Sequence, residues 1–161
     1  MRKILLSVAA ICLMSVSGLA ESYSCGDMPK WRQLAELGIV DAQLVLGKDY
    51  MSGQCGIKDE AEAFKWFRLA ASQGDAGAQT AVGFYYLQGE VVQRDFTEGA
   101  RWLKMAADKG IPLAQKLLGL LYVAGKGVEQ NTSMACFWFR KACNSGEKES
   151  CSYLNQYLNQ Y

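Results

Sequence analysis

Residues 42–74 read AQLVLGKDYMSGQCGIKDEAEAFKWFRLAASQG, and the same pattern returns twice more along the chain at an offset of 36 residues. Three glycine positions, one tyrosine, one tryptophan and two alanine positions recur without an insertion. They are Ala42, Ala78 and Ala114; Gly47, Gly83 and Gly119; Tyr50, Tyr86 and Tyr122; Gly53, Gly89 and Gly125; Trp66, Trp102 and Trp138; Ala70, Ala106 and Ala142; and Gly74, Gly110 and Gly146. A fixed period of this length indicates a repeat architecture.

Each 36-residue unit has the apolar spacing of two helices. In its first half apolar residues recur every fourth position, and in its second half they fall at i, i+3, i+4 and i+7. We therefore expect three helix pairs, in which the first helices span 40–52, 76–88 and 112–124 and the second helices span 59–73, 95–109 and 131–145. The flanking segments fit the same frame, which predicts an additional capping helix at 28–37 and another at 148–159.

Polar and glycine residues mark the ends of the second helices. The expected N-caps are Asp59, Asp95 and Asn131, and the expected terminating residues are Gly74, Gly110 and Gly146. Glu62 and Glu98 follow the first two N-caps by three residues, as in capping boxes. Glycine also recurs inside the first helices, where it costs about 1 kcal/mol relative to alanine. We expect a neighbouring helix to approach closely at those mid-helix glycines.

The repeated string resembles a known family. Ala42-x3-Leu46-Gly47-x2-Tyr50-x2-Gly53, followed by Ala63-x2-Trp66-Phe67-x2-Ala70-Ala71-x2-Gly74, is similar to the Sel1-like repeat, a relative of the tetratricopeptide repeat. The resemblance covers 28–159, with repeats at about 39–74, 75–110 and 111–146. Cys55 and Val91 depart from the loop glycine seen at Gly127, and Cys143 replaces the second alanine. The resemblance implies an all-α fold, a right-handed α-solenoid whose first helices line a concave face.

The start of the chain predicts export. Arg2 and Lys3 precede the apolar run 4–16, and Gly18-Leu19-Ala20 has the small residues of a cleavage site. We interpret 1–20 as a signal peptide and 21–161 as the repeat domain. The apolar run is shorter than the roughly 20 residues that a membrane-spanning helix needs. The sequence thus predicts a periplasmic or secreted bacterial protein without a transmembrane segment.

Five cysteines follow the predicted signal peptide, in a compartment where disulfides persist. Cys143 ends one helix and Cys151 begins the next, so a helix pair brings them within bonding range, and the spacing also resembles that of cysteine-rich Sel1-like proteins. Cys25 precedes the leading helix and Cys55 lies in the loop before the helix that stacks on it, which predicts a second disulfide. Cys136 remains, and we favour a buried thiol over a reactive or intermolecular one.

Composition excludes several classes of function. The chain has no histidine, which excludes a Ser/His/Asp triad, a Cys/His dyad and a histidine-ligated zinc site. Without residues 1–20, 15 bases stand against 16 acids, and this balance argues against nucleic-acid binding. No metal-ligand cluster, phosphate loop or Ser-x-x-Lys nucleophile pattern within one predicted helix is evident. We therefore expect no catalytic residue, no metal and no cofactor.

Positions that vary between repeats are candidates for binding a partner, because the fold does not require them. On the predicted concave face they are Asp41, Leu44, Lys48, Thr80, Phe84, Gln88, Lys116 and Leu120. Phe84 and Leu120 replace Lys48, which places an apolar strip among charges, as in a protein-binding groove. At the next position Tyr85 and Leu121 replace Asp49, and packing and binding explain these two residues equally well.

The resemblance implies a monomeric, non-enzymatic module that binds another protein on its concave face. Three alternatives remain open. The first is an immunity protein that neutralises a toxic effector delivered into the periplasm. The second is a penicillin-binding or weakly β-lactam-hydrolysing protein, as associated with cysteine-rich relatives. The third is an envelope scaffold that binds peptidoglycan or a larger assembly.

Overall fold

The computed structural model describes residues 24–158, with side chains as far as Tyr157. The predicted signal peptide at 1–20 lies outside the described residues. Within 24–158 all regular secondary structure is helical, and no strand is present. After a short 3₁₀ turn, the helices are α2 (Met28–Glu36), α3 (Val40–Ser52), α4 (Glu60–Ser72), α5 (Ala76–Gln88), α6 (Phe96–Asp108), α7 (Pro112–Ala124), α8 (Thr132–Asn144) and α9 (Lys148–Leu158).

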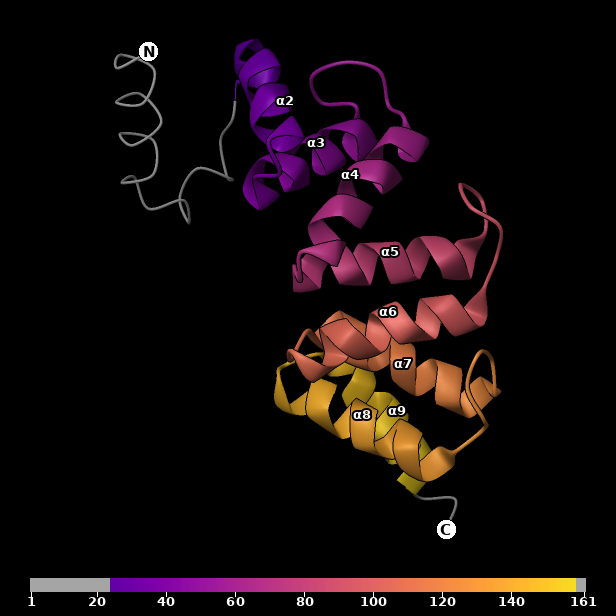
Figure 1. Ribbon diagram of the computed structural model, residues 1–161. Coiled ribbons are helices and arrows are strands. Elements are labelled where there is room, and N and C mark those ends of the chain that lie inside the picture. The colour runs from indigo at the N-terminus through magenta and orange to yellow at the C-terminus, as the bar shows by residue number, and fades with distance from the viewer. Residues whose placement is uncertain (1–23, 159–161) are drawn as a thin grey trace.

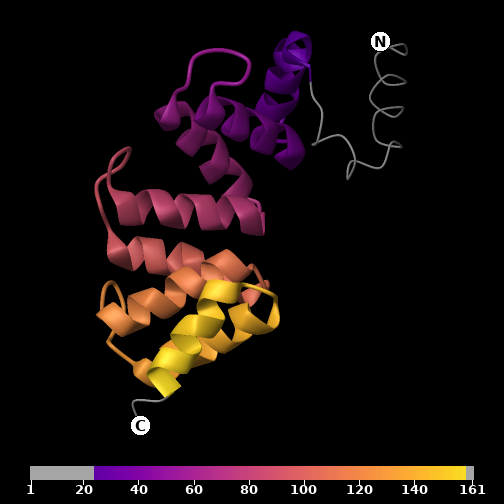
Figure 2. The same ribbon diagram turned by 180° about the vertical axis from the view of Figure 1, so that it is seen from behind.

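The helices are stacked in chain order, from α2 at one end to α9 at the other (Figures 1 and 2). Each helix packs mainly against the helices that precede and follow it in the sequence. This arrangement is the all-α solenoid of helix pairs that the 36-residue period predicts. The described residues include no helix long and apolar enough to cross a membrane.

The predicted N-caps of the second helices are present. The Asp59 side chain accepts hydrogen bonds from the backbone N–H groups of Ala61 and Glu62, both at 3.0 Å. Asp95 and Asn131 cap α6 and α8 in the same way. Each cap satisfies N–H groups that the first turn of a helix leaves without a partner.

The prediction of complete capping boxes at Glu62 and Glu98 is wrong. The backbone N–H of Asp59 donates to the carbonyl oxygen of Tyr50, at the end of the preceding helix, at 2.8 Å. Glu62 instead pairs with Lys65, and Glu98 pairs with Arg101 one turn further along its helix. The glutamates have no N-cap N–H left to accept from, because the carbonyl oxygen of the first helix already occupies it.

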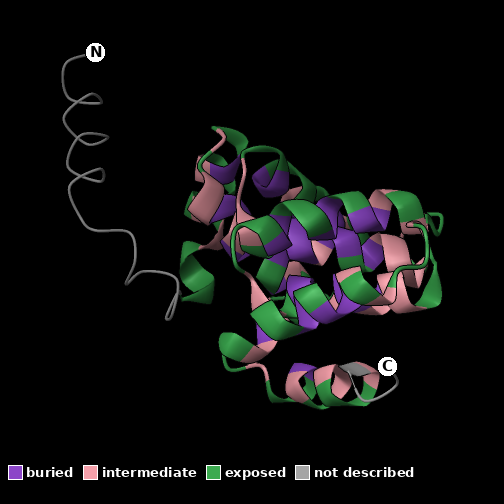
Figure 3. Ribbon diagram, turned by 90° about the horizontal axis from the view of Figure 1, so that it is seen from below, coloured by how far each residue is buried: buried purple, intermediate pink, exposed green. Residues whose placement is uncertain are grey.

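The recurring mid-helix glycines are confirmed as sites of close approach. A Cβ atom on Gly47 would lie 2.8 Å from the Phe67 ring, and one on Gly119 would lie 2.6 Å from the Phe139 ring. In the first and third units a phenylalanine ring of the second helix therefore occupies the space above the glycine, and in the second unit Leu103 does so above Gly83. Figure 3 shows the buried residues gathered where neighbouring helices meet, with exposed residues around the outside of the stack.

A buried glutamine also recurs, and the sequence did not reveal its role. In each first helix its side chain donates from Nε2 to a carbonyl oxygen eight residues earlier, near the end of the preceding second helix. The bonds run from Gln43 to Ala35 at 3.2 Å, from Gln79 to Ala71 at 3.2 Å and from Gln115 to Ala107 at 3.1 Å. These bonds join consecutive units, because each links a second helix to the first helix of the next pair.

Both predicted disulfides are present, and they fix the two ends of the stack. Cys25 bonds to Cys55, with their Cα atoms 5.0 Å apart, and Cys143 bonds to Cys151, with their Cα atoms 4.8 Å apart. Cys136 is free and buried, as expected. Disulfides are typical of proteins outside the cytoplasm.

Candidate protein-binding surface

A hollow of about 430 Å³ lies over α5, between the C-terminal end of α3, the start of α4 and the first turns of α7. We call it the α5 hollow. It is lined by Met51, Glu60, Gly77, Thr80, Ala81, Phe84, Tyr85, Gln88, Glu90, Leu113 and Leu117. Six of these residues lie on one face of α5, at the spacing expected of a helical stripe.

The α5 hollow exposes large apolar side chains from three helices. Met51 is 45% exposed, Phe84 is 45% exposed and Leu113 is 48% exposed. Single exposed apolar residues are ordinary on a protein surface, whereas several that border one depression indicate an interaction site. The exposed residues here share one depression, which distinguishes them from Leu37 and Ile57, exposed apolar residues elsewhere on the molecule.

Tyr85 places a phenol hydroxyl in this apolar surrounding. The residue is only 5% exposed, and its ring packs edge-on against Phe64 with centroids 5.6 Å apart. The residue lines the α5 hollow, and within residues 24–157 its hydroxyl makes no hydrogen bond. Burial raises the pKa of Tyr85, and the negative charge of Glu60 adds to the effect. The hydroxyl therefore stays protonated at neutral pH.

Two carboxylates, Glu60 and Glu90, complete the lining, and no basic side chain contributes to it. Glu60 begins α4 and pairs with Lys58, whose Nζ lies 2.6 Å from Oε1. Glu90 follows α5 and takes part in no ion pair among the described residues. The guanidinium of Arg94, nearby in sequence, donates from Nε to the carbonyl oxygen of Gln88 at 3.3 Å.

The structure brings three of the eight predicted binding residues together. Thr80, Phe84 and Gln88 line the α5 hollow. The other five, Asp41, Leu44, Lys48, Lys116 and Leu120, do not. Leu44 packs against the core cluster beneath α5, and Lys116 turns toward α9, where its Nζ lies 2.6 Å from Glu149 Oε2.

The predicted residues are separated because adjacent first helices, such as α5 and α7, turn different faces toward the α5 hollow. The α5 hollow includes Leu113 and Leu117 of α7. In the repeat these two leucines are equivalent to Gly77 and Ala81 of α5, 36 residues earlier. Sequence analysis missed both leucines, although variation between repeats marks position 113 as clearly as it marks Phe84. Of the two residues left open, Leu121 is buried in the core, whereas Tyr85 is buried and also lines the α5 hollow.

Comparison with protein families identifies the repeat. The Sel1 repeat matches residues 40–75, 76–111 and 112–147. This chain is a Sel1-repeat protein. Sel1-repeat proteins generally act as protein-interaction modules, and their fold is typically a non-enzymatic scaffold.

Solved Sel1-repeat structures share its architecture. A Sel1 repeat protein from Oxalobacter formigenes is 33% identical, with a TM-score of 0.74 over 81% of this chain and 98% of that one. A protective antigen of uropathogenic Escherichia coli, c5321, is 39% identical, with a TM-score of 0.72 over 76% of this chain and 26% of that one. Cysteine-rich protein B of Helicobacter pylori shares the fold at 24% identity, with a TM-score of 0.63 over 83% of this chain and 98% of that one. No curated protein sequence matches the chain significantly.

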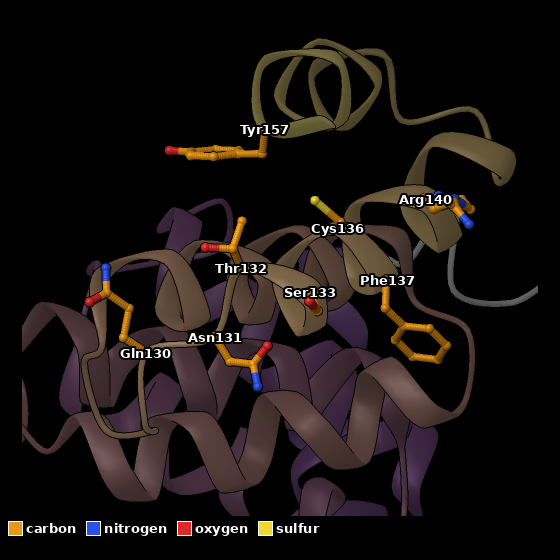
Figure 4. Close-up of a pocket in the computed structure, with 8 residues that line it drawn as sticks. All are labelled: Gln130, Asn131, Thr132, Ser133, Cys136, Phe137, Arg140 and Tyr157. Carbon is orange, nitrogen blue, oxygen red and sulfur yellow. The ribbon is translucent and has the colours of Figure 1, made fainter. Parts of the chain in front are cut away.

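This Sel1-repeat protein has a second hollow, of about 680 Å³, between α8 and α9. It is lined by Gln130, Asn131, Thr132, Ser133, Cys136, Phe137, Arg140 and Tyr157. Figure 4 shows Thr132 and Cys136 pointing from α8 toward the ring of Tyr157. We call it the α8–α9 hollow.

The repeat itself explains the α8–α9 hollow. In the first unit, the ring of Phe64 fills the corresponding place and packs against Tyr85, which aligns with Tyr157 two periods later. In the second unit the position equivalent to Phe64 is Ala100, and Phe96, one helical turn before it, packs against the core instead. The third unit has the smaller Thr132 and Cys136 at these two positions, so no aromatic ring of the unit fills the space. Among the described residues, no group of three metal-ligating side chains is gathered at either hollow.

Proposed function

We propose that this Sel1-repeat protein is exported and binds another polypeptide in the α5 hollow without catalysing a reaction. The observation that carries the proposal is the exposure of Phe84, in a depression whose walls are formed by the apolar residues Met51 and Leu113. Aromatic residues that enter a desolvated pocket dominate the binding energy of many protein interfaces.

The size of the α5 hollow also supports this function. A depression of about 430 Å³ lies within the range that holds a few side chains of a bound segment. The helices beneath it are held by buried glutamine bonds and by close glycine contacts, so α5 is supported on both sides. Such a rigid support lowers the cost of ordering the surface when a partner binds.

Two disulfides in a chain of this size support export, because thiols are kept reduced in the cytosol. The experiment for export is expression of the full chain with its own leader in a Gram-negative host. We expect the periplasmic product to begin at Glu21 by mass spectrometry and to contain both disulfides. A full-length product that starts at Met1 and stays in the cytoplasm would contradict export.

The experiment for binding uses the purified protein immobilised against the extracytoplasmic fraction of its source organism. Phe84→Ala is compared with Phe137→Ala, because Phe84 is 45% exposed and Phe137 is 46% exposed but lies outside the α5 hollow. We expect a partner that the wild-type protein and Phe137→Ala retain and that Phe84→Ala loses. If Phe137→Ala loses the partner and Phe84→Ala retains it, the binding surface is the α8–α9 hollow instead.

A further inference from the structure

We infer that the α5 hollow receives a lysine or arginine side chain of the partner polypeptide. This inference rests on the proposed function, since it names the chemistry of the group that the same surface binds. The occupant is a side chain with an apolar stem and a positively charged head, and each part has a counterpart in the hollow.

The charge of the lining favours a cation. Glu60 and Glu90 lie at the α5 hollow, and its lining contains no lysine or arginine. Glu90 takes part in no ion pair among the described residues, so its charge is available to an incoming group. A cation that enters the α5 hollow is attracted by both carboxylates, and attraction of this kind helps to determine which partners an interface accepts.

Tyr85 provides the second, independent observation. The residue is only 5% exposed, and its hydroxyl has no hydrogen-bond partner within residues 24–157. The hydroxyl oxygen is not among the fully buried unpaired atoms of the described residues, so it stays open to the α5 hollow, where a donor of the partner can replace water. A guanidinium or ammonium N–H donor from the partner would give the phenol oxygen the bond that this chain does not supply.

The apolar walls match the stem of the same side chain. Phe84 and Leu113 are about half exposed at the α5 hollow, and Leu117 lies beside them. Lysine and arginine bury their methylene stems on apolar surface while the charged head reaches polar groups. The Phe84 ring also offers its face to a guanidinium. A purely apolar side chain would cover these walls but would leave Glu90 and the Tyr85 hydroxyl without a partner.

The chain's own cations do not replace the proposed group. Lys58 pairs with Glu60, but its side chain is 59% exposed, and an exposed pair of this kind is readily exchanged. Arg94 donates to the carbonyl oxygen of Gln88 at the end of α5. Neither Lys58 nor Arg94 lines the α5 hollow.

The test is an NMR titration of the isotopically labelled protein with N-acetyl-arginine methylamide. The matched probe is the corresponding citrulline compound, which has the same shape and no charge. We expect the arginine probe to shift backbone signals of residues 77–88 and to bind roughly fivefold or more tightly than the citrulline probe. Equal binding of the two probes, or shifts centred elsewhere, would overturn the inference.

Variants locate the charged contact. Glu60→Gln combined with Glu90→Gln should abolish the preference for arginine over citrulline, whereas Glu129→Gln, an exposed acid outside the α5 hollow, should keep it. Tyr85→Phe should weaken arginine binding, whereas Tyr86→Phe should not. Melting temperatures and spectra of each variant establish that it is folded. If the paired glutamine variant keeps the full preference, the inference is wrong.

The inference and the proposed function can fail separately. If Phe84→Ala loses the partner but the paired glutamine variant retains it as the wild type does, the α5 hollow binds a partner through a neutral group. In that case the proposed function stands and the inference falls. If the partner is retained by both variants, the α5 hollow is not the binding surface, and both fall.

Discussion

Cys151 in α9 is bonded to Cys143 in α8 at the place in the repeat where, 36 residues earlier, Gln115 donates a hydrogen bond to Ala107. The same glutamine bond is present at the two preceding junctions. The disulfide is thus the covalent form of a contact that recurs along the stack. It lies at the last described junction, where α9 packs on α8 without a following helix among the described residues.

This relationship predicts that glutamine can partly replace the disulfide. In the chain-entropy model, a loop of this size contributes about 2–3 kcal/mol to the free energy of unfolding. The double variant Cys143→Ala with Cys151→Ala should lose that contribution. The variant Cys143→Ala with Cys151→Gln should recover about 1 kcal/mol, because the side chain can bond to the carbonyl oxygen of residue 143. Urea denaturation measures both, and equal stabilities would contradict the equivalence of the two contacts.

A pair of glycines allows α5 and α6 to pack closely together. A Cβ atom on Gly83 would lie 3.1 Å from the carbonyl oxygen of Gly99 and 2.7 Å from Leu103, and a Cβ atom on Gly99 would lie 3.2 Å from the carbonyl oxygen of Gly83. We expect Gly83→Ala to lower the free energy of unfolding by about 1–3 kcal/mol, because the helices must move apart. Gly77→Ala, in the first turn of α5, should be nearly neutral. Thermal denaturation compares the two, and equal losses would contradict this packing argument.

Acid should weaken the attachment of α9 to the stack. Burial raises the pKa of Glu147, but the hydrogen bonds from Ser150 and the charge of Lys116 outweigh it, and the resulting pKa is lowered. The hydrogen bond from Lys116 likewise lowers the pKa of Glu149. A carboxyl group whose pKa is lowered on folding stabilises the folded state when the pH is above its usual pKa. It loses this contribution as the pH falls through the lowered pKa.

We therefore expect hydrogen-exchange protection of α9, corrected for intrinsic exchange rates, to fall several-fold as the pH drops below the usual carboxyl range. Lys116→Met should reduce this dependence. Lys104→Met, which removes a pair with Asp108 on α6, should leave the exchange of α9 unchanged. Protection of α9 that does not change with pH in the wild-type protein would show that these ion pairs do not hold the helix.

Filling the α8–α9 hollow should stabilise the protein. Cys136→Phe puts a ring where Phe64 lies in the first unit, with Tyr157 available to pack against it. We expect a gain of about 1 kcal/mol in the free energy of unfolding, from an aromatic contact and added burial. Cys136→Ala, which copies Ala100 of the second unit, should give no gain. A loss of stability with phenylalanine would indicate that the hollow is too narrow for a ring.

The helices could be predicted closely because their signals are local. The αL glycines at Gly53, Gly89 and Gly125 end the first helices, and the N-cap side chains begin the second ones. The capping boxes failed for a non-local reason, since the carbonyl oxygen of Tyr50 reaches the N–H of Asp59 from the preceding helix. No pattern within a single helix contains that contact.

The binding residues were harder to predict than the fold. Phe84 was found because it departs from its repeat equivalents, whereas Lys116 departs in the same way and yet pairs with glutamates next to α9. Which of the two faces solvent depends on the helix that packs beside it. Met51 and Glu60 join the α5 hollow from the end of one helix and the start of another, and neither is among the predicted concave-face residues.

The sequence by itself determined the period, the helix ends, the close glycine contacts and the pairing of four cysteines, because each depends on residues near one another in the chain or at a constant offset. Tertiary structure alone decided which side chains share the α5 hollow and that the α8–α9 space is left unfilled. The physical reason is that adjacent helices meet through different faces, so that equivalent positions in the repeat acquire different neighbours.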